Sequence, residues 1–398
     1  MSTVSPRASA LKPSATLAMG AKAKKLAAEG NDVVNFTLGE PDFKTPKNIC
    51  EAAKKAIDDG WHGYTPSKGR PDLLKAIAGH YKKFIGIDYD PTTEIVASPG
   101  AKFSVYLAFQ VLLGEGDEAL MPAPYWVSYP EMIQLSGATP VVVETKESDG
   151  FALTAATLEK AITPKTKVLL LNSPSNPSGA VIPPAEIRNI AQVLEKRNIW
   201  CISDEIYDRL AYDGMEVLSI ASCSEWMRNH SIIINGCSKA YAMTGWRLGW
   251  AAGPKEVMKA ADAWQSQETS NVCAIVQAAG IEALNGQQDS VDVMKAEFDK
   301  RRRLVVQLLN DIPGVTCIMP KGAFYAYPNI SGLFGKTMEG VTINSPMAFC
   351  EVALNKKYVA LVAGEDFGSP HHVRISYACS EERIREGCKR LKDMVLGK

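Results

Sequence analysis

The chain has 398 residues, of which 46% are hydrophobic and 22% charged, and this length and composition predict a globular protein with two lobes. Its 44 Lys and Arg residues balance 44 Asp and Glu residues, and the zero net charge argues against proteins that bind nucleic acid or an anionic membrane through a basic excess. The longest apolar runs, such as residues 168–171 and 232–234, are far too short to span a membrane.

The N-terminal segment lacks the apolar run that begins a secretory signal, so we expect a cytoplasmic protein. Residues 1–28 carry five basic residues and no acidic one, which leaves import into an organelle open, although we favour a basic arm that leads into a helix. The nine cysteines are scattered and never form a Cys-x-x-Cys pair, which argues against a disulfide scaffold or a zinc site. His371 and His372 are expected on opposite faces of a strand, so we predict no metal site.

Short β-branched runs alternate with longer helical patterns from about residue 94 to 252. Between two of these runs, Pro183 and Pro184 open a helix whose apolar residues recur at helical spacing, namely Ile187, Ile190, Ala191 and Leu194. Such β-α-β units predict a mainly parallel sheet with helices on both faces. We expect seven strands, over residues 94–97, 119–122, 141–143, 167–171, 199–203, 231–235 and 248–252.

The pattern changes after about residue 295. A charged stretch, residues 300–303, is expected to form the solvated face of a long helix. Strands are predicted over 315–319, 323–327, 358–362 and 373–377, and a last helix from Glu381. We therefore predict a large α/β domain over residues 46–294 and a smaller α+β domain made of residues 1–45 and 295–398.

Polar residues follow four of the predicted strands of the large sheet. Open α/β sheets bind ligands beyond the carboxyl ends of their strands. After the first strand, residues 98–102 (Ser-Pro-Gly-Ala-Lys) open a helix whose bare backbone N–H groups suit an anion. The other three strands are followed by a polar turn over 172–179, by Asp204 with Tyr207, and by Ser238 and Lys239 with Arg247 further along.

A lysine and a carboxylate beside an anion site suit pyridoxal phosphate, which needs a Schiff-base lysine, an acidic partner for its pyridine nitrogen and donors for its phosphate. The motifs of two other kinds of cofactor site are absent or incomplete. No Gly-x-Gly-x-x-Gly sequence follows a predicted strand, which argues against a dinucleotide site. Residues 335–337 (Gly-Lys-Thr) imitate the end of a phosphate-binding loop, but position 330 is Ile rather than Gly.

Five segments resemble the class I aminotransferases, which are pyridoxal phosphate-dependent enzymes of fold type I. They are residues 39–43 (GEPDF), 124–130 (PYWVSYP), 172–179 (NSPSNPSG), 203–207 (SDEIY) and 238–249 (SKAYAMTGWRLG), in the family's order. The resemblance runs from about Leu11 to the C-terminus and is nearest to the bacterial-type aspartate aminotransferases, some of which also use prephenate. It implies the aspartate aminotransferase-like fold and a homodimer with shared active sites.

The resemblance also implies roles for individual residues. Lys239 is expected to be the Schiff-base lysine and proton shuttle, and Asp204 the partner of the pyridine nitrogen. Tyr207 and Asn176 are expected to bond the phenolic oxygen of the cofactor, and Trp126 to stack on its ring. The phosphate is expected to bind a set of donors made up of Gly100, Ala101, Lys102, Ser238, Arg247 and, from the other subunit, Tyr64.

Two cationic residues are expected to recognise substrate carboxylates. Arg374 resembles the arginine that binds the α-carboxylate, and it lies on the polar side of a predicted strand, opposite Val373 and Ile375. Gly39 lets the backbone approach that carboxylate, and Trp126 and Asn176 border the same substrate. Lys102 is the candidate for the distal carboxylate, and the pair of Lys102 and Thr16 resembles members that accept prephenate. Gly236 stands where the family often has serine, which removes one phosphate donor.

The sequence therefore predicts an aspartate aminotransferase, which converts L-aspartate and 2-oxoglutarate to oxaloacetate and L-glutamate by a ping-pong cycle through pyridoxamine phosphate. One alternative is a prephenate or aromatic aminotransferase with the same residues. A second is a lyase on the same fold, which needs no lasting pyridoxamine form. A non-catalytic regulator is disfavoured, because it would carry a DNA-binding module for which the residues before the match leave no room.

Overall fold

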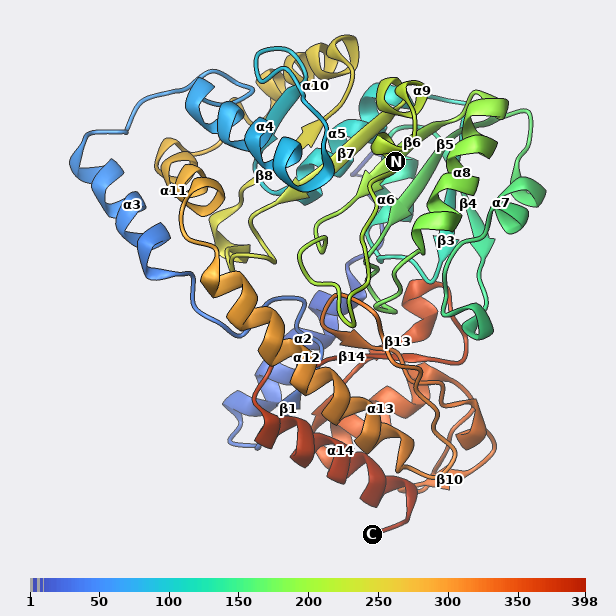
Figure 1. Ribbon diagram of the computed structural model, residues 1–398. Coiled ribbons are helices and arrows are strands. Elements are labelled where there is room, and N and C mark those ends of the chain that lie inside the picture. The colour runs from blue at the N-terminus through green and yellow to red at the C-terminus, as the bar shows by residue number, and fades with distance from the viewer. Residues whose placement is uncertain (1–2, 6–7, 10) are drawn as a thin grey trace.

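The computed structural model describes residues 3–5, 8–9 and 11–398. Its largest sheet has seven strands in the order β2-β8-β7-β6-β5-β3-β4 (Figure 1). All their pairings are parallel except those of β8, which runs antiparallel to β7 and β2. The seven predicted strands and the mainly parallel sheet are thus confirmed. The strands are β2 Ile95–Ser98, β3 Glu118–Ala123, β4 Thr139–Glu144, β5 Thr166–Asn172, β6 Trp200–Asp204, β7 Ser231–Gly236 and β8 Gly249–Ala252.

Helices cover both faces of this sheet, so its inner strands are apolar on both sides, whereas the edge strand β4 is partly exposed. In β5, Val168 and Leu170 belong to one core and Leu169 and Leu171 to the other, as the alternation of side chains along a strand requires. The first core holds helices α5 Ala101–Leu112, α6 Tyr129–Leu135 and α10 Lys255–Glu268. The second core holds α3 Lys47–Asp58, α4 Pro71–Ile85, α7 Ala155–Ala161, α8 Pro184–Arg197, α9 Glu225–Asn229 and α11 Ala274–Asn285.

The remaining elements form a smaller α+β part, in the lower half of Figure 1. Strand β1 (Val34–Asn35) pairs in parallel with β12 (Val359–Ala360), which joins the N-terminal segment to the C-terminal region. An antiparallel sheet has the order β13-β14-β9, from Val362–Ala363, Val373–Ser376 and Tyr325–Ala326. The other elements are α2 Ala15–Ala28, α12 Asp289–Asn310, β10 Thr337–Met338, β11 Val341–Thr342, α13 Pro346–Lys357 and α14 Glu381–Val395.

Five short 3-10 helices complete the secondary structure that the described residues show: η1 Glu147–Asp149, η2 Ile220–Ser222, η3 Thr244–Trp246, η4 Ser331–Leu333 and η5 Gly364–Phe367. The last helix begins at Glu381 as predicted, because the Ser380 hydroxyl accepts a hydrogen bond from the Arg383 N–H and caps the first turn. The domain boundaries proposed above, at residues 45/46 and 294/295, stay a prediction.

Two expectations for the smaller part are wrong. Residues 315–319 form no strand beyond an isolated bridge between Thr316 and Asn329, because the side chain of Asn310 bonds both backbone groups of Cys317 and so replaces a neighbouring strand. The charged stretch 300–303 is not simply a solvated face. Arg302 in α12 is fully buried and donates to Asp213, in the loop after β6, and to Asp299. Arg302 lies on the buried face of α12, and the carboxylates of Asp213 and Asp299 compensate its charge there.

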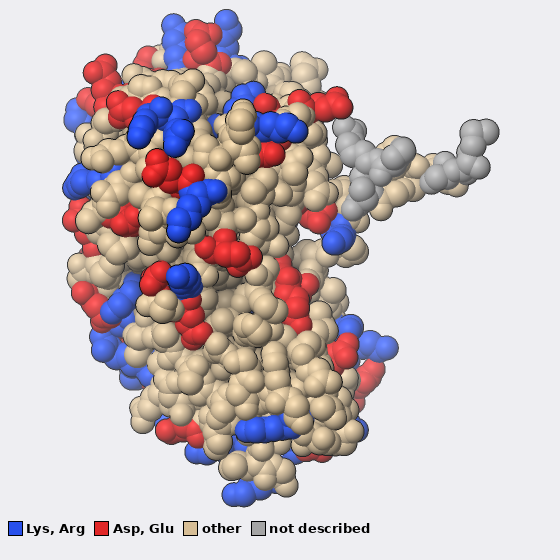
Figure 2. All heavy atoms as spheres, turned by 90° about the vertical axis from the view of Figure 1, so that its right-hand side faces the viewer, with Lys and Arg blue, Asp and Glu red and all other residues tan. Residues whose placement is uncertain are grey.

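Positive and negative side chains are mixed over the face shown in Figure 2, in keeping with the zero net charge. No helix among the described residues is long and apolar enough to cross a membrane.

Candidate active site

A cavity of about 230 Å³ lies at the carboxyl ends of β5, β6 and β7, where these strands face the smaller part. Fourteen residues were predicted to form the site, and the structure brings most of them together around this cavity. Those that line it are Thr16, Gly39, Ala101, Lys102, Trp126, Asn176, Asp204, Tyr207, Ser238, Lys239, Arg247 and Arg374. The two others are Gly100, which precedes Ala101, and Tyr64, which lies elsewhere and is 94% exposed.

Lys239 reaches the cavity from the loop that follows β7. Its Nζ donates a hydrogen bond to the Gly39 carbonyl of the N-terminal segment. Burial lowers the pKa of Lys239 to about 8, and the nearby Arg374 and Arg247 act in the same direction while Glu40 opposes them. A substantial fraction of this amine is therefore neutral near physiological pH, as a nucleophile or base must be.

Asp204 ends β6 and is buried. Its Oδ2 accepts a hydrogen bond from the Tyr129 hydroxyl at 2.7 Å, and its Oδ1 accepts one from the Ile206 N–H at 3.2 Å. Burial raises the pKa of Asp204, although the Tyr129 hydrogen bond and the charge of Lys239 act against that rise. A cationic group bound in the cavity would stabilise this carboxylate in its charged form.

The start of α5 lies beside these residues and is suited to an anion. Gly100 precedes the helix with φ +92°, and a Cβ built on it would lie 2.2 Å from an Nη atom of Arg247. A Cβ on Gly249 would likewise lie 2.1 Å from the Ala101 nitrogen. The two glycines therefore let Arg247 and strand β8 approach the first turn of the helix, where the free N–H groups and the positive end of the helix dipole favour an anion.

Arg374 in β14 is buried, and its guanidinium lies against the rings of Tyr325 and Phe367, 4.7 and 5.1 Å from their centroids. Its two Nη atoms donate to Asn176 Oδ1 at 3.0 Å and to the Thr37 carbonyl at 2.7 Å. Its buried Nε has no hydrogen-bond partner among the described residues. A buried N–H group without an acceptor is costly, so this arginine is suited to an anionic ligand in the cavity.

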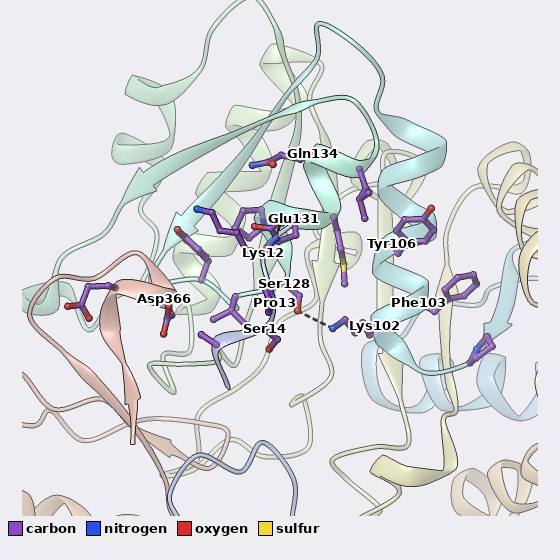
Figure 3. Close-up of a pocket in the computed structure, with 18 of the residues that line it drawn as sticks. Lys12, Pro13, Ser14, Lys102, Phe103, Tyr106, Ser128, Glu131, Gln134 and Asp366 are labelled. Atoms are coloured by element: carbon purple, nitrogen blue, oxygen red, sulfur yellow. Dashed lines mark hydrogen bonds between the residues drawn. The ribbon is translucent and has the colours of Figure 1, made fainter. Parts of the chain in front are cut away.

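Lys102 borders both this cavity and a larger one of about 660 Å³, and Figure 3 shows it among the residues that line the larger one. Its Nζ donates to Ser128 Oγ at 3.1 Å and lies 5.1 Å from the ring centroid of Trp126. Burial, with a smaller effect of Arg247, lowers the pKa of Lys102. Thr16 borders the smaller cavity, and its hydroxyl is buried without a hydrogen-bond partner among the described residues. Lys12 and Ser14 of the N-terminal segment border the larger cavity.

The structure adds residues that the sequence interpretation missed. The Tyr325 hydroxyl lies 2.9 Å from that of Tyr207, and Tyr129 bonds Asp204. Asn172 also lines the cavity, and its Oδ1 accepts from the Asn176 N–H at 2.9 Å. Tyr129 and Asn172 lie within segments 124–130 and 172–179, which resemble the family, so these segments offered a signal for them. Tyr325 lay in a predicted strand but had no such signal, because it reaches the cavity only when β9 pairs with β14. The described residues contain no group of three His, Cys, Asp or Glu side chains arranged to hold a metal ion.

Residues 31–391 match the family model of the class I and II aminotransferases. The sequence is 44% identical, over the full length of both chains, to the aspartate/prephenate aminotransferase of Cereibacter sphaeroides. It is also 44% identical to the aspartate aminotransferase of Geobacillus stearothermophilus, over 97% of each chain. Among solved structures, the aspartate aminotransferase of Rhizobium meliloti superposes with a TM-score of 0.95 at 40% identity, over 99% of each chain. The Thermus thermophilus aspartate aminotransferase with maleate gives a TM-score of 0.93 at 38% identity, over 99% of this chain and 100% of that one.

Proposed function

This chain belongs to the class I and II aminotransferase family, and from that premise we propose that it transfers the amino group of L-aspartate to 2-oxoglutarate, giving oxaloacetate and L-glutamate. The observation that carries the choice of substrate is the pair of cationic side chains, Arg374 and Lys102, that border the same cavity as Lys239. A dicarboxylic amino acid would place one carboxylate on each of them. Its α-amino group would then lie near Lys239.

We propose pyridoxal phosphate as the cofactor, and the chemistry of the cavity fits it. Lys239 would hold it covalently, and Asp204 would pair with its pyridine nitrogen, supplying the charge partner that the buried carboxylate otherwise lacks. Tyr207 and Asn176 would bond its phenolic oxygen, and Trp126 would lie on its ring. Its phosphate would bind at the start of α5, where the N–H groups of Ala101 and Lys102 would donate to it together with Ser238 and Arg247. The Gly100 N–H instead donates to the Ser98 carbonyl at 2.6 Å, so Gly100 would contribute by allowing the close approach of Arg247. When bound, this cofactor acts as an electron sink for a carbanion at the substrate Cα.

The protein's own groups would orient the substrate and move its proton. Arg374 would bind the α-carboxylate through its guanidinium, whose Nε has no other partner among the described residues, and Gly39 would leave room for the carboxylate. Once it no longer holds the cofactor, the amine of Lys239 would be placed to take the proton from Cα and to return it in the reverse direction, and its burial favours the neutral form that a base needs. Lys102, with Thr16 beside it, would hold the distal carboxylate.

A second candidate activity is the transamination of prephenate. It is favoured by the larger cavity of about 660 Å³, which adjoins the first at Lys102 and offers room for a keto acid bulkier than oxaloacetate. A relative of 44% identity is named aspartate/prephenate aminotransferase. A carbon–sulfur or elimination lyase on the same fold has no such support.

We also propose a homodimer in which Tyr64 of each subunit reaches the phosphate site of the other, because this aromatic side chain is 94% exposed in the single chain. We propose that the protein is cytoplasmic. We also propose a large domain of residues 46–294 and a small domain made of residues 1–45 and 295–398.

A half-reaction tests these proposals. Protein loaded with pyridoxal phosphate is mixed with L-aspartate alone, and oxaloacetate release and cofactor absorbance are followed. We expect about one oxaloacetate per subunit and one lasting spectral change, because the amino group stays on the cofactor until a keto acid arrives. L-Glutamate should behave alike, and L-phenylalanine should react poorly. Conversion by L-arogenate would support the prephenate activity, whereas continuous ammonia release without a lasting spectral change would indicate a lyase.

A further inference from the structure

A second polar cluster lies outside the candidate active site, around a cavity of about 370 Å³. Glu147 belongs to η1, which follows the edge strand β4 of the large sheet. Asn329, Ser369 and His372 belong to the smaller part. Glu147 Oε2 accepts from Asn329 Nδ2 at 2.7 Å and lies 3.2 Å from His372 Nε2, while Ser369 Oγ lies 2.7 Å from His372 Nδ1. One carboxylate of the large part is thus bonded to two side chains of the smaller part.

The partners of His372 determine its hydrogen-bonding state. The carboxylate of Glu147 only accepts, so Nε2 carries the hydrogen, and Nδ1 is then free to accept from the Ser369 hydroxyl. Burial lowers the pKa of His372, while Glu147 opposes this change and His371 adds to it. Glu144 and Lys146 are the other charged side chains that border the cavity. The neutral imidazole therefore uses both of its nitrogens.

The ring of His372 is also fixed by packing. It is stacked on Tyr327 at 4.9 Å with an interplanar angle of 7°, and Phe151 meets it edge-on at 5.2 Å. His372 is buried, at 5% exposure. Two aromatic neighbours and two hydrogen bonds hold this ring in one orientation, so it links the position of Glu147 to strand β14, which begins at the next residue.

That strand leads directly to Arg374. His372 and Arg374 are two residues apart, so their side chains lie on the same face. The backbone here is paired on the β9 side, by a bridge between Asn329 and His372 and by the hydrogen bond from the Val373 N–H to the Pro328 carbonyl. Aromatic contacts continue the connection, since Tyr327 packs edge-on against Phe367 at 6.2 Å and Phe367 lies under the Arg374 guanidinium.

We propose that His372 is a positioning residue for the proposed transamination, which ties Glu147 to the start of β14 and so holds the Arg374 guanidinium where the substrate α-carboxylate binds. The inference rests on the proposed function, because it assigns the α-carboxylate to Arg374. It assigns no contact with the substrate to His372 itself.

Two substitutions of His372 separate its two hydrogen bonds. In His372→Gln, the amide nitrogen occupies the position of Nε2 and keeps the bond to Glu147. In His372→Asn, the shorter amide reaches only the position of Nδ1 and keeps the bond to Ser369. We expect His372→Asn to raise the KM for L-aspartate about tenfold with a much smaller change in kcat, whereas His372→Gln stays within about threefold of the wild type.

Glu147 provides a second variant at a site that is only partly buried, which protects the test against a failure of His372→Asn to fold. Glu147→Ala should raise KM to a similar extent, and the double variant with His372→Asn should be no worse than either single variant, because both break the same link. Glu144→Ala is the matched control, since it removes a carboxylate from the same cavity and should leave KM unchanged.

A binding measurement distinguishes this inference from the proposed function. Calorimetric titration of each pyridoxal phosphate-loaded protein with succinate reports carboxylate affinity without turnover, and we expect His372→Asn and Glu147→Ala to weaken it about tenfold while the absorbance of the bound cofactor is retained. Wild-type succinate affinity and KM in both variants would overturn the role of His372 and leave the aminotransferase standing. A wild-type protein that neither binds succinate nor transaminates aspartate would overturn both.

Discussion

At the scale of the residue, burial and mutual charge give the candidate site its chemistry. Lys239, Asp204 and Arg374 are ordinary ionisable residues in the sequence, yet the fold places all three around one cavity of about 230 Å³. Burial favours the neutral form of each group: it lowers the pKa values of Lys239 and Arg374 and raises the pKa of Asp204. Such shifts are typical of ionisable groups at functional sites.

The amine of Lys239 should titrate far below that of a surface lysine. In apoprotein treated with an amine-selective reagent, labelling of the peptide that contains Lys239 should rise with pH around a midpoint of about 8. At pH 7.4 the neutral fraction is then about two hundredfold larger than for an unperturbed lysine. Mass spectrometry measures the labelling, and denatured protein gives the reference midpoint near 10. A midpoint near 10 in the native apoprotein would contradict this assignment.

Arg374 should be irreplaceable by another cation. We expect Arg374→Lys to raise the KM for L-aspartate and for L-glutamate by about 10- to 100-fold, because a lysine cannot present two parallel N–H groups to a carboxylate or fit between the rings of Tyr325 and Phe367. Steady-state kinetics measures this change, and the absorbance of the bound cofactor checks that the site still loads. An unchanged KM would place the α-carboxylate elsewhere.

At the scale of the element, the close approach of two backbones shapes the start of α5, where we propose that the cofactor phosphate binds. Strand β8 passes the first turn of α5 at a distance that only glycine permits at position 249, and Arg247 lies against Gly100 in the same way. The helix start alone, with its bare N–H groups, is a common feature. Its combination with a guanidinium and a serine at the end of β7 is what makes it suited to a phosphate.

Gly100→Ala should therefore weaken cofactor binding. The new Cβ would force the guanidinium of Arg247 away from the helix start, and its φ of +92° adds strain for any residue with a side chain. We expect an affinity for pyridoxal phosphate at least about tenfold lower, from the loss of a charge-assisted contact. Gly60→Ala is the control, because Gly60 also has positive φ, +77°, but nothing lies within 4 Å of its Cβ position. Absorbance titration measures the affinity, and equal affinities in the two variants would count against the anion site.

At the scale of the whole molecule, the site depends on parts of the chain that are far apart. The segment with Gly39 and Thr16, the sheet with Asp204 and Lys239, and strand β14 with Arg374 all meet at one cavity. Ion pairs between buried arginines and partly exposed carboxylates also join distant segments, as when Arg302 in α12 binds Asp213 and Arg301 binds Asp42. In the proposed homodimer a further residue, Tyr64, would come from the other subunit.

Subunit mixing tests that assembly. Tyr64→Ala and Lys239→Ala proteins should each have low activity, and in a mixture that exchanges subunits the hybrid dimers should regain one intact site each. Statistical exchange then gives roughly a quarter of the wild-type activity. Activity before and after mixing, with sedimentation to show the dimer, measures the effect. Activity that stays at the level of the separate variants would mean that Tyr64 serves its own subunit or none.

Much of this architecture was predictable from the sequence. The strands of the large sheet carry apolar runs that alternate with helical patterns, because a strand covered on both faces must be apolar throughout. The edge strand β4 is covered less completely, and its apolar run is limited to Val141, Val142 and Val143. Site residues at strand ends, such as Asp204 and Lys239, were predictable because parallel strands present their carboxyl ends at one edge. Local capping likewise placed the start of α14 at Glu381.

Other features depend on contacts between distant segments, and no local sequence pattern indicates them. The strand predicted at 315–319 does not form because the side chain of Asn310 bonds the backbone of Cys317. Arg302 can be buried because the carboxylate of Asp213, distant in sequence, pairs with it. Tyr325 joins Tyr207, and His372 joins Glu147, only when the smaller part packs against the large sheet. The sequence by itself thus determined the elements and the residue types of the chemistry, since local periodicity and capping act over a few residues. The tertiary structure decided which side chains are paired, because burial, charge compensation and hydrogen bonding act between neighbours in space.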